Sequence, residues 1–126
     1  MASKTTPTTT DQNLQFILSV KVWIPASKQS EFFSLFKPVY DACVAEEECL
    51  FFVVGEPEDA GDGNISISWT EGWTNPVEWF MTVQMKRDYY EPYMSTTEAM
   101  FTKPRWFEIL KPKDGYTAFK LQSQSQ

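Results

Sequence analysis

The sequence predicts an α+β protein with a ferredoxin-like sandwich, in which helices cover one face of an antiparallel sheet. Its 126 residues, 42% of them hydrophobic, suffice for one domain with a single core. Apolar and polar residues alternate along 14–24 and 65–73, as they do in half-buried strands. Elsewhere the apolar spacing becomes helical, so the expected order is strand, helix, strand, strand, helix, helix, strand.

The first part of the chain is expected to hold a tail, a strand and a helix. Residues 1–12 are rich in Thr and Ser and lack periodicity, so we expect a disordered tail before a single domain over 13–121. Pro25 is expected to end the strand that begins at Leu14. Ser27 is a suitable N-cap for a helix that extends to about Glu46, and Pro38 is expected to bend this helix.

Two more strands follow. The continuous apolar run Cys49–Val54 predicts a central strand. The acidic segment 56–64, EPEDAGDGN, does not follow the EF-hand order of calcium ligands and predicts a solvated hairpin loop. In the next strand, 65–73, Glu71 falls on the same face as Ile65, Ile67, Trp69 and Trp73. A carboxylate is therefore expected on an apolar face.

The strand leads into a helix with a strong start signal. Asn75 can cap it, Pro76 suits its first turn and Glu78 can close a capping box. Apolar residues at helical spacing reach Gln84, so an amide joins the apolar stripe. The segment Tyr89–Pro92 is expected to interrupt the chain before a helix that ends near Phe101, ahead of Pro104.

The C-terminal part is expected to form two short strands, 105–110 and 116–121, joined by a turn at KPKDG, and then a disordered tail over 122–126. Strands 49–54 and 65–73 present more large apolar groups than one helical layer covers. We therefore expect two subunits to pack sheet against sheet as a homodimer. The aromatic content of 16% fits a lined cavity, an aromatic interface or a bulky core.

The sequence lacks the features that are typical of several classes of function. A net charge of -6 argues against nucleic acid and anionic membrane surfaces. The chain has no apolar run of the ~18 residues that a membrane span needs, and its first residues lack an apolar core, so we expect a cytoplasmic protein. Cys43 and Cys49 are expected to be buried free thiols.

The sequence also lacks the motifs that indicate catalysis through a metal or a common cofactor. The chain contains no His, which removes histidine-based triads, zinc sites and a proximal haem ligand. Glycine-rich nucleotide loops and CxxC pairs are absent from the sequence too. The sequence therefore predicts a site with no cofactor and no metal, or no catalytic site.

Three segments resemble the antibiotic biosynthesis monooxygenase (ABM) domains of the dimeric α+β barrel superfamily, and particularly their fungal members. They are the strand ending E-x-W, here Glu71-Gly72-Trp73, the Cys49 start of the second strand, and the closing TEAMFTKPRWFEIL, Thr97–Leu110. The likeness covers most of 14–112. Many members carry a His, four residues and a second His after E-x-W; here Gln84 and Tyr89 correspond to that pattern.

The resemblance implies a cofactor-independent, monooxygenase-like enzyme of secondary-metabolite biosynthesis, which acts with O2 on a polycyclic aromatic intermediate of phenol or anthrone type, such as one derived from a polyketide. Characterised members oxidise polycyclic phenols or anthrones with O2, and the missing His removes the haem-degrading branch. Glu71, Gln84 and Tyr89 become the candidate catalytic residues, converging between strand 65–73 and the helix after it. The candidate walls for a small hydrophobic aromatic substrate are Trp69, Trp73, Trp79, Met81, Tyr90 and Tyr93.

Each candidate has a structural interpretation beside the functional one. Glu71 is either a base whose pKa burial raises, or a group held by a hydrogen bond to backbone or to Arg105. Gln84 and Tyr89 either orient a substrate oxygen or satisfy each other. The alternative functions are a dehydratase, cyclase or isomerase on a polyketide-like intermediate, and a non-catalytic dimeric ligand-binding protein with a cavity too small for two fused rings.

Overall fold

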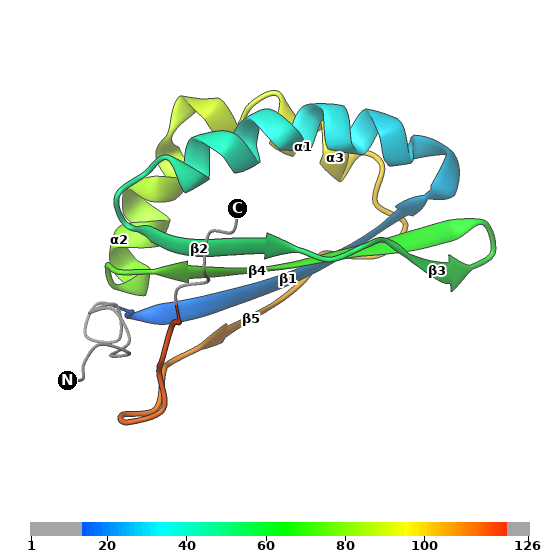
Figure 1. The fold of residues 1–126 in the computed structure, drawn as a ribbon. Helices are drawn as coiled ribbons and strands as arrows, with labels where there is room; N and C mark the ends of the chain where they lie inside the picture. Colours follow the sequence, from blue (N-terminus) through cyan, green and yellow to red (C-terminus); the bar gives the residue numbers. More distant parts are fainter. Residues whose placement is uncertain (1–13, 121–126) are drawn as a thin grey trace, which may run out of the picture.

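The computed structural model describes residues 14–120, so the tails expected at 1–12 and 122–126 lie outside the described residues. A layer of helices covers one side of an antiparallel sheet (Figure 1). Three short 3-10 turns, η2 (Ala26–Lys28), η3 (Gln84–Lys86) and η4 (Asp88–Tyr90), connect the main elements. These elements are β1 (Phe16–Pro25), α1 (Gln29–Val44), β2 (Cys49–Val54), β3 (Glu58–Gly61), β4 (Asn64–Trp73), α2 (Val77–Thr82), α3 (Tyr93–Glu98) and β5 (Trp106–Leu110).

The strand order confirms the predicted fold class. The sheet runs β2-β4-β1-β5, and β3 pairs with β4 as well. The first strand therefore lies inside the sheet between β4 and the last strand, which is the ferredoxin-like arrangement. Antiparallel pairing places Phe16 opposite Trp73 and Pro25 opposite Asn64 along the full length of β1 and β4. This long ladder holds the centre of the sheet.

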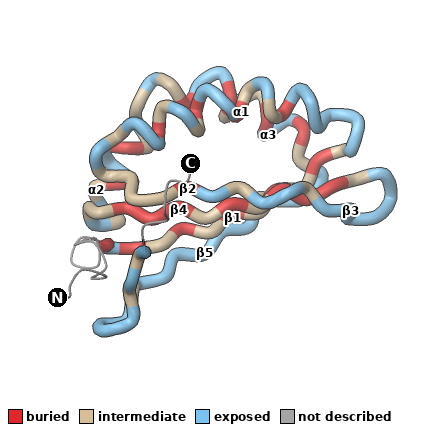
Figure 2. Tube along the Cα trace, viewed as in Figure 1, coloured by how far each residue is buried: buried red, intermediate tan, exposed pale blue. Residues whose placement is uncertain are grey.

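The core lies between the ladder and the helices (Figure 2). Alternate residues of β1 from Phe16 to Ile24 are buried, and they lie opposite the buried alternate residues of β4. The amphipathic helix α1 completes the core with Phe32, Phe36, Val39 and Cys43. Burying each large apolar side chain contributes about 1.5–3 kcal/mol, so the two period-two strands supply much of the driving force for folding.

Both predicted helix starts were wrong in detail. Ser27 lies inside the turn η2 and does not cap α1, whose N-cap is Lys28 without a side-chain hydrogen bond. The capping box at Asn75 and Glu78 does not form, because extended Pro76 is the N-cap of α2. In both places a proline, Pro25 or Pro76, keeps the chain extended and delays the helix.

The second helix is shorter than its apolar stripe suggests. It ends at Thr82, and Gln84 begins the separate turn η3. Pro38, by contrast, is accommodated within α1, which continues to Val44. The next helix, α3, ends at Glu98, before the predicted limit near Phe101.

The strand β2 was predicted to be central, and this was wrong. Among the described strands β2 pairs only with β4, so it lies at an edge, where Val53 is 63% exposed. Its apolar side chains serve both faces: Phe52 joins the core, whereas Phe51 covers Gly72 on the outer face. A Cβ on Gly72 would lie 2.2 Å from the Phe51 ring, so this close approach requires glycine.

One loop prediction and one strand prediction also need correction. The acidic segment 56–64 contains the strand β3, which pairs with the start of β4 and ends at a tip with positive φ at Gly61, Asp62 and Gly63. No strand forms over 116–120, where the chain lies against the outer face with Phe119 5.7 Å from the Phe51 ring. The strand predicted at 105–110 is confirmed as β5.

Within residues 14–120, none of the helices has the length and apolar character that a membrane crossing requires.

Candidate functional site

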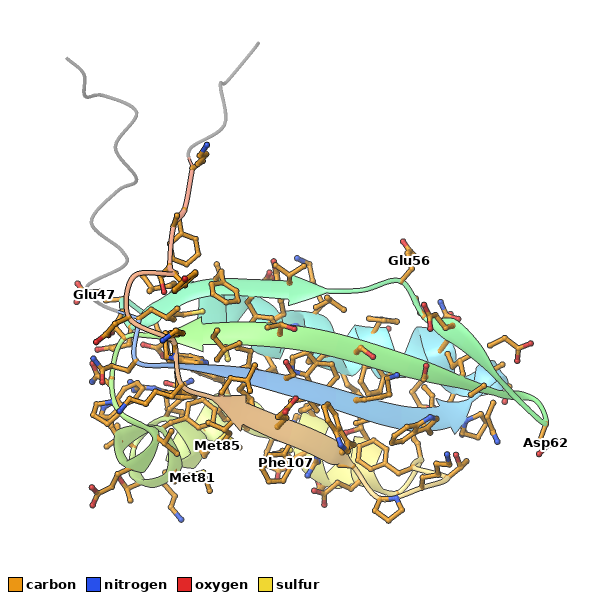
Figure 3. All side chains as sticks on the ribbon, turned by 90° about the horizontal axis from the view of Figure 1, so that it is seen from below. Glu47, Glu56, Asp62, Met81, Met85 and Phe107 are labelled. Atoms are coloured by element: carbon orange, nitrogen blue, oxygen red, sulfur yellow. The ribbon has the colours of Figure 1, made fainter. Side chains whose placement is uncertain are left out.

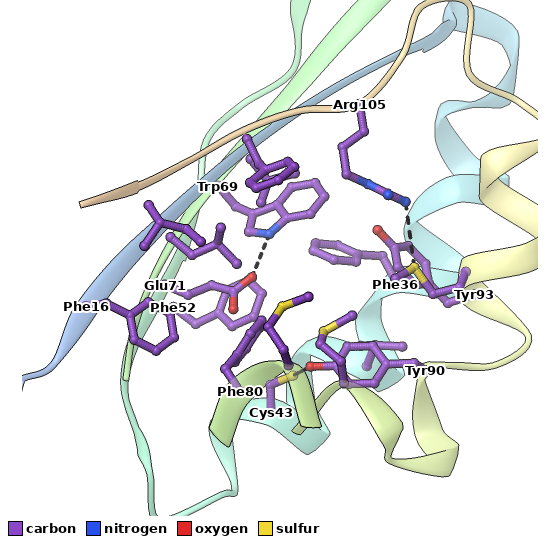
Figure 4. A pocket seen from close by; sticks show the side chains of 18 residues that line it. Phe16, Phe36, Cys43, Phe52, Trp69, Glu71, Phe80, Tyr90, Tyr93 and Arg105 are labelled. Atoms are coloured by element: carbon purple, nitrogen blue, oxygen red, sulfur yellow. Dashed lines mark hydrogen bonds between the residues drawn. The ribbon is translucent and has the colours of Figure 1, made fainter. Parts of the chain in front are cut away.

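A cavity of about 220 Å³ lies between the helix-facing side of the sheet and the helical layer (Figure 4). Its wall is almost entirely apolar and aromatic, with few polar groups. Strands β1, β2, β4 and β5 and helices α1, α2 and α3 all contribute to it. The lining residues are Phe16, Leu18, Val20, Phe36, Val39, Cys43, Phe52, Trp69, Glu71, Phe80, Met81, Met85, Tyr90, Tyr93, Met94, Arg105, Phe107 and Ile109.

Two tryptophans hold the buried carboxylate of Glu71. The Trp69 indole Nε1 donates to Glu71 Oε2 at 2.9 Å, and the Trp73 indole Nε1 donates to Oε1 at 2.9 Å. The three residues lie two apart on β4, so they point to the same side of the sheet. Glu71 therefore receives its partners from its own strand, and not from the backbone or Arg105 as the structural interpretation predicted.

The surroundings of Glu71 raise its pKa into the neutral range. Burial raises the pKa of Glu71 to about 7, while the two indole hydrogen bonds oppose this rise by stabilising the carboxylate. Both protonation states are therefore populated near neutral pH. A group of this kind can accept a proton from a ligand and later return it.

Gln84 and Tyr89 belong to a polar network outside the cavity. Gln84 is fully buried, and its Nε2 donates to Tyr89 Oη at 2.7 Å and to Tyr90 Oη at 3.0 Å. Arg87 Nε donates to Gln84 Oε1 at 2.9 Å, and Tyr89 Oη donates to Glu46 Oε2 at 2.9 Å. Arg87 also pairs with Glu46 at 3.1 Å. The two predicted residues do contact each other, within a larger network.

The predicted site residues thus divide into two groups. Those in the cavity wall are Glu71, Trp69, Met81, Tyr90 and Tyr93. Trp73, Trp79, Gln84 and Tyr89 are not among the lining residues. Trp73 lies behind the wall, where it donates a hydrogen bond to Glu71, and Trp79 packs 6.0 Å from the Trp73 ring. The structure therefore brings the predicted base together with aromatic walls, but without the predicted amide.

Sequence reasoning named Met81 but missed the other residues at the open side of the cavity. We call this the mouth, and define it by Met81, Met85, Met94, Phe107 and Ile109. Figure 3 shows Phe107 of β5 near Met81 and Met85. Phe107 lies opposite Val20 and Ile109 opposite Leu18, so both point to the helix-facing side, yet they are 59% and 40% exposed. The alternation along β5 is the signal that could have identified them.

The two thiols of the chain, of which Cys43 lines the cavity, are protonated at neutral pH. Burial raises the pKa of Cys43 to about 11 and that of Cys49 to about 12. Both cysteines are free, as predicted, but only Cys43 is buried and Cys49 is partly exposed. Cys43 Sγ lies 3.3 Å from Tyr90 Oη, which links the cavity wall to the polar network. Within residues 14–120, no three His, Cys, Asp or Glu side chains come together as a metal-holding group.

Comparisons with known proteins agree with this architecture. No family model matches the chain. The chain is similar to "Putative monooxygenase GME11364" of Pestalotiopsis microspora, with 27% identity over 121 residues that cover 96% of this chain and 92% of that protein.

Solved structures show the same fold. A conserved protein from Methanosarcina mazei Go1 superposes with a TM-score of 0.65 and 19% identity, covering 81% of this chain and 96% of that one. A structure described as "Putative antibiotic biosynthesis monooxygenase" from Nitrosomonas europaea gives a TM-score of 0.65 and 13% identity, covering 80% and 92%. The resemblance predicted from the sequence is thereby confirmed: the chain has the fold of ABM proteins and is similar to a fungal monooxygenase-like protein.

The raised pKa of Glu71 predicts a fall in stability as pH rises. Between pH 4.5 and about 7 the unfolded chain has lost this proton while the folded protein keeps it, so the free energy of unfolding decreases with pH. The loss is on the order of 3 kcal/mol by pH 8. Urea unfolding at pH 5 and pH 8 measures it, and Glu71→Gln should remove most of the difference.

The exposed Glu56→Gln is the matched control and should keep the wild-type dependence on pH. An equal pH dependence in the wild type and Glu71→Gln would contradict the assignment of the raised pKa.

The network predicts that Gln84 is structural. Gln84→Met removes the amide that bonds Tyr89, Tyr90 and Arg87, and should lower the free energy of unfolding by about 1–3 kcal/mol. Turnover or ligand binding per folded molecule should stay unchanged, because Gln84 does not line the cavity. Gln29→Met, at an exposed position of α1, is the control. If Gln84→Met loses activity while its stability is unchanged, the structural role is wrong and Gln84 belongs to the active site.

Proposed function

We propose that this protein is a cofactor-independent monooxygenase that oxidises a small hydroxyaromatic compound, of phenol or anthrone type, with O2. The observation that carries the proposal is Glu71, a carboxyl group with a pKa of about 7 in a cavity that is otherwise almost entirely apolar. The similarity to the fungal protein named "Putative monooxygenase GME11364" supports an oxidative function for this site.

The size of the cavity limits the substrate. An engineered apolar cavity of ~150 Å³ binds benzene, and pockets for drug-sized ligands reach ~300–1,000 Å³. A cavity of about 220 Å³ therefore suits two fused rings, with any further ring extending through the mouth. This volume argues against the alternative in which the cavity is too small for a bicyclic compound.

The first step of the proposed reaction is proton transfer. The Glu71 carboxylate accepts the proton of the substrate hydroxyl, which leaves an electron-rich ring oxygen. This anion gives one electron to O2, and the resulting superoxide joins the ring radical at a carbon atom. Protonated Glu71 returns its proton to the peroxide. The walls formed by Phe36, Phe52 and Trp69 exclude water from these intermediates.

The second step completes the oxidation. The ring carbon loses its hydrogen as a proton while the O–O bond breaks, so a carbonyl group forms and hydroxide leaves to become water. One oxygen atom of O2 enters the product and the other becomes water. The substrate supplies all of the electrons, so the reaction needs no external reductant.

We also propose that the protein is a homodimer in which the sheets pack against each other. Trp106 and Leu110 of β5 lie opposite Lys21 and Ile17, so they point away from the helices. They are 47% and 45% exposed, and Val53 of β2 is exposed on the same outer face. A second copy of this sheet would cover these groups, as a twofold interface does in many small proteins.

Oxygen uptake tests the reaction. With 1-naphthol and anthrone as probes, we expect O2 consumption whose kcat/KM rises through a pH of about 7, because only ionised Glu71 can accept the proton. Glu71→Gln should lower kcat/KM by about 10²–10⁴-fold, the usual contribution of a general base. The exposed Glu78→Gln is the control and should stay near wild type.

Two results would contradict the monooxygenase proposal and favour one of the alternative functions. Conversion of a probe without O2 uptake would indicate the dehydratase, cyclase or isomerase alternative, which needs only the acid and base function of Glu71. Tight binding of a probe without any conversion would indicate a ligand-binding protein.

Sedimentation velocity tests the dimer. At micromolar concentration the wild type should sediment as a dimer, and Leu110→Glu should shift it to monomer because a charge would be buried at the interface. Val44→Glu, a matched change at a 47% exposed apolar residue on the helical layer, should leave the dimer intact. A wild-type protein that sediments only as monomer would overturn this proposal.

A further inference from the structure

We propose that Arg105 binds an anionic group of the substrate, so that the natural ligand is a hydroxyaromatic carboxylate held between Arg105 and Glu71. The hydroxyl end of this ligand rests on the proposed function, in which Glu71 accepts the hydroxyl proton. The carboxylate end rests on the surroundings of Arg105 alone.

Arg105 immediately precedes β5 and reaches the cavity from there. Its side chain is 29% exposed, so most of it is withdrawn from water. Figure 4 shows Arg105 and Glu71 at different sides of the cavity, with aromatic groups such as Trp69 and Phe36 around them. The apolar wall therefore has one charged group at each of two sides.

Among the described residues that line the cavity, Arg105 is the single cation. The chain as a whole carries a net charge of -6, so its general field repels anions. An anionic ligand group thus finds one attractive position in the cavity. The opposite orientation would place it against the Glu71 carboxylate, which disfavours like charge.

Several N–H donors of the Arg105 guanidinium have no hydrogen-bond partner within residues 14–120. It carries five N–H donors, and a carboxylate can bind two of them side by side. Within residues 14–120, its hydrogen bonds use only Nη2, which contacts Glu98 Oε2 at 3.0 Å and Met94 Sδ at 3.7 Å. The guanidinium also lies 5.3 Å from the centre of the Phe101 ring, which restrains its position. Nε and Nη1 are therefore available to a ligand.

The ion pair between Arg105 and Glu98 does not satisfy the guanidinium in place of an anionic ligand. The Glu98 side chain is 52% exposed, and ion pairs that are open to solvent contribute little to stability. Glu98 instead offers a second way to test the idea, because its negative charge lies beside the proposed anion site. Removing that charge should strengthen the binding of an anion and leave a neutral ligand unaffected.

Calorimetric titration with three matched probes tests the proposal: 6-hydroxy-2-naphthoate, its methyl ester and 2-naphthol. The wild type should bind the carboxylate about tenfold more tightly than the ester, the contribution of one charge-assisted pair. Arg105→Gln should abolish this preference. Lys103→Gln is the matched control, since it removes the same charge two residues away, where the Lys103 ammonium lies 4.7 Å from the Trp23 ring.

Two further variants keep the test decisive if Arg105→Gln folds poorly. Arg105→Lys keeps the charge and should retain part of the preference. Glu98→Gln should tighten carboxylate binding about two- to fivefold and leave ester binding unchanged. Equal binding of carboxylate and ester by the wild type, or a preference that survives Arg105→Gln, would overturn the anion site.

The outcomes separate this inference from the proposed function. Arg105-dependent binding of the carboxylate without any O2 uptake would support the anion site and overturn the oxidation. Oxidation of all three probes with equal affinity would support the oxidation and overturn the anion site. Glu71→Gln should lose turnover and keep the preference for the carboxylate.

Discussion

The two indole hydrogen bonds to Glu71 are the interaction on which the site depends. A carboxylate buried without partners would cost several kcal/mol and would stay protonated throughout the neutral range. Trp69 and Trp73 each supply one donor at 2.9 Å, which holds the carboxyl group in place and keeps its pKa at about 7. Both donors come from β4, so the register of one strand sets the orientation of the acid. The Phe80 ring, 5.3 Å from the Trp73 ring, fixes that indole in turn.

The cavity exists because the helical layer and the sheet differ in extent. Helix α1 packs tightly over β1, β2 and β4, where Phe36 lies 4.7 Å from Trp69. Beyond it, α2 and α3 have only six residues each, and the turns between them leave β5 incompletely covered. Phe107 and Ile109 therefore point to the helical side without being buried. These short helices thereby leave the mouth open.

Much of the fold followed from local patterns, whereas the site did so only in part. Alternation along 14–24 and 65–73 predicts which side chains share a face, and the inward position of Glu71 follows from it directly. Partners that come from distant elements carry no such signal. Glu46, which precedes β2, completes the network around Gln84 through Tyr89 and Arg87, and no spacing rule relates Glu46 to Gln84. The place of Arg105 depends on where the helical layer ends, which a single-sequence pattern does not report.

Gln84 and Glu71 look alike in the sequence, as polar groups on apolar stripes, but their hydrogen-bonding capacity separates them. Gln84 has two N–H donors and an acceptor oxygen, and Tyr89, Tyr90 and Arg87 engage all three. An ionised carboxylate accepts about four hydrogen bonds, and the described structure provides Glu71 with two. Only Glu71 borders the cavity. A buried group with engaged neighbours stabilises the fold, and one with free acceptor capacity beside a cavity is placed to receive the proton of a ligand.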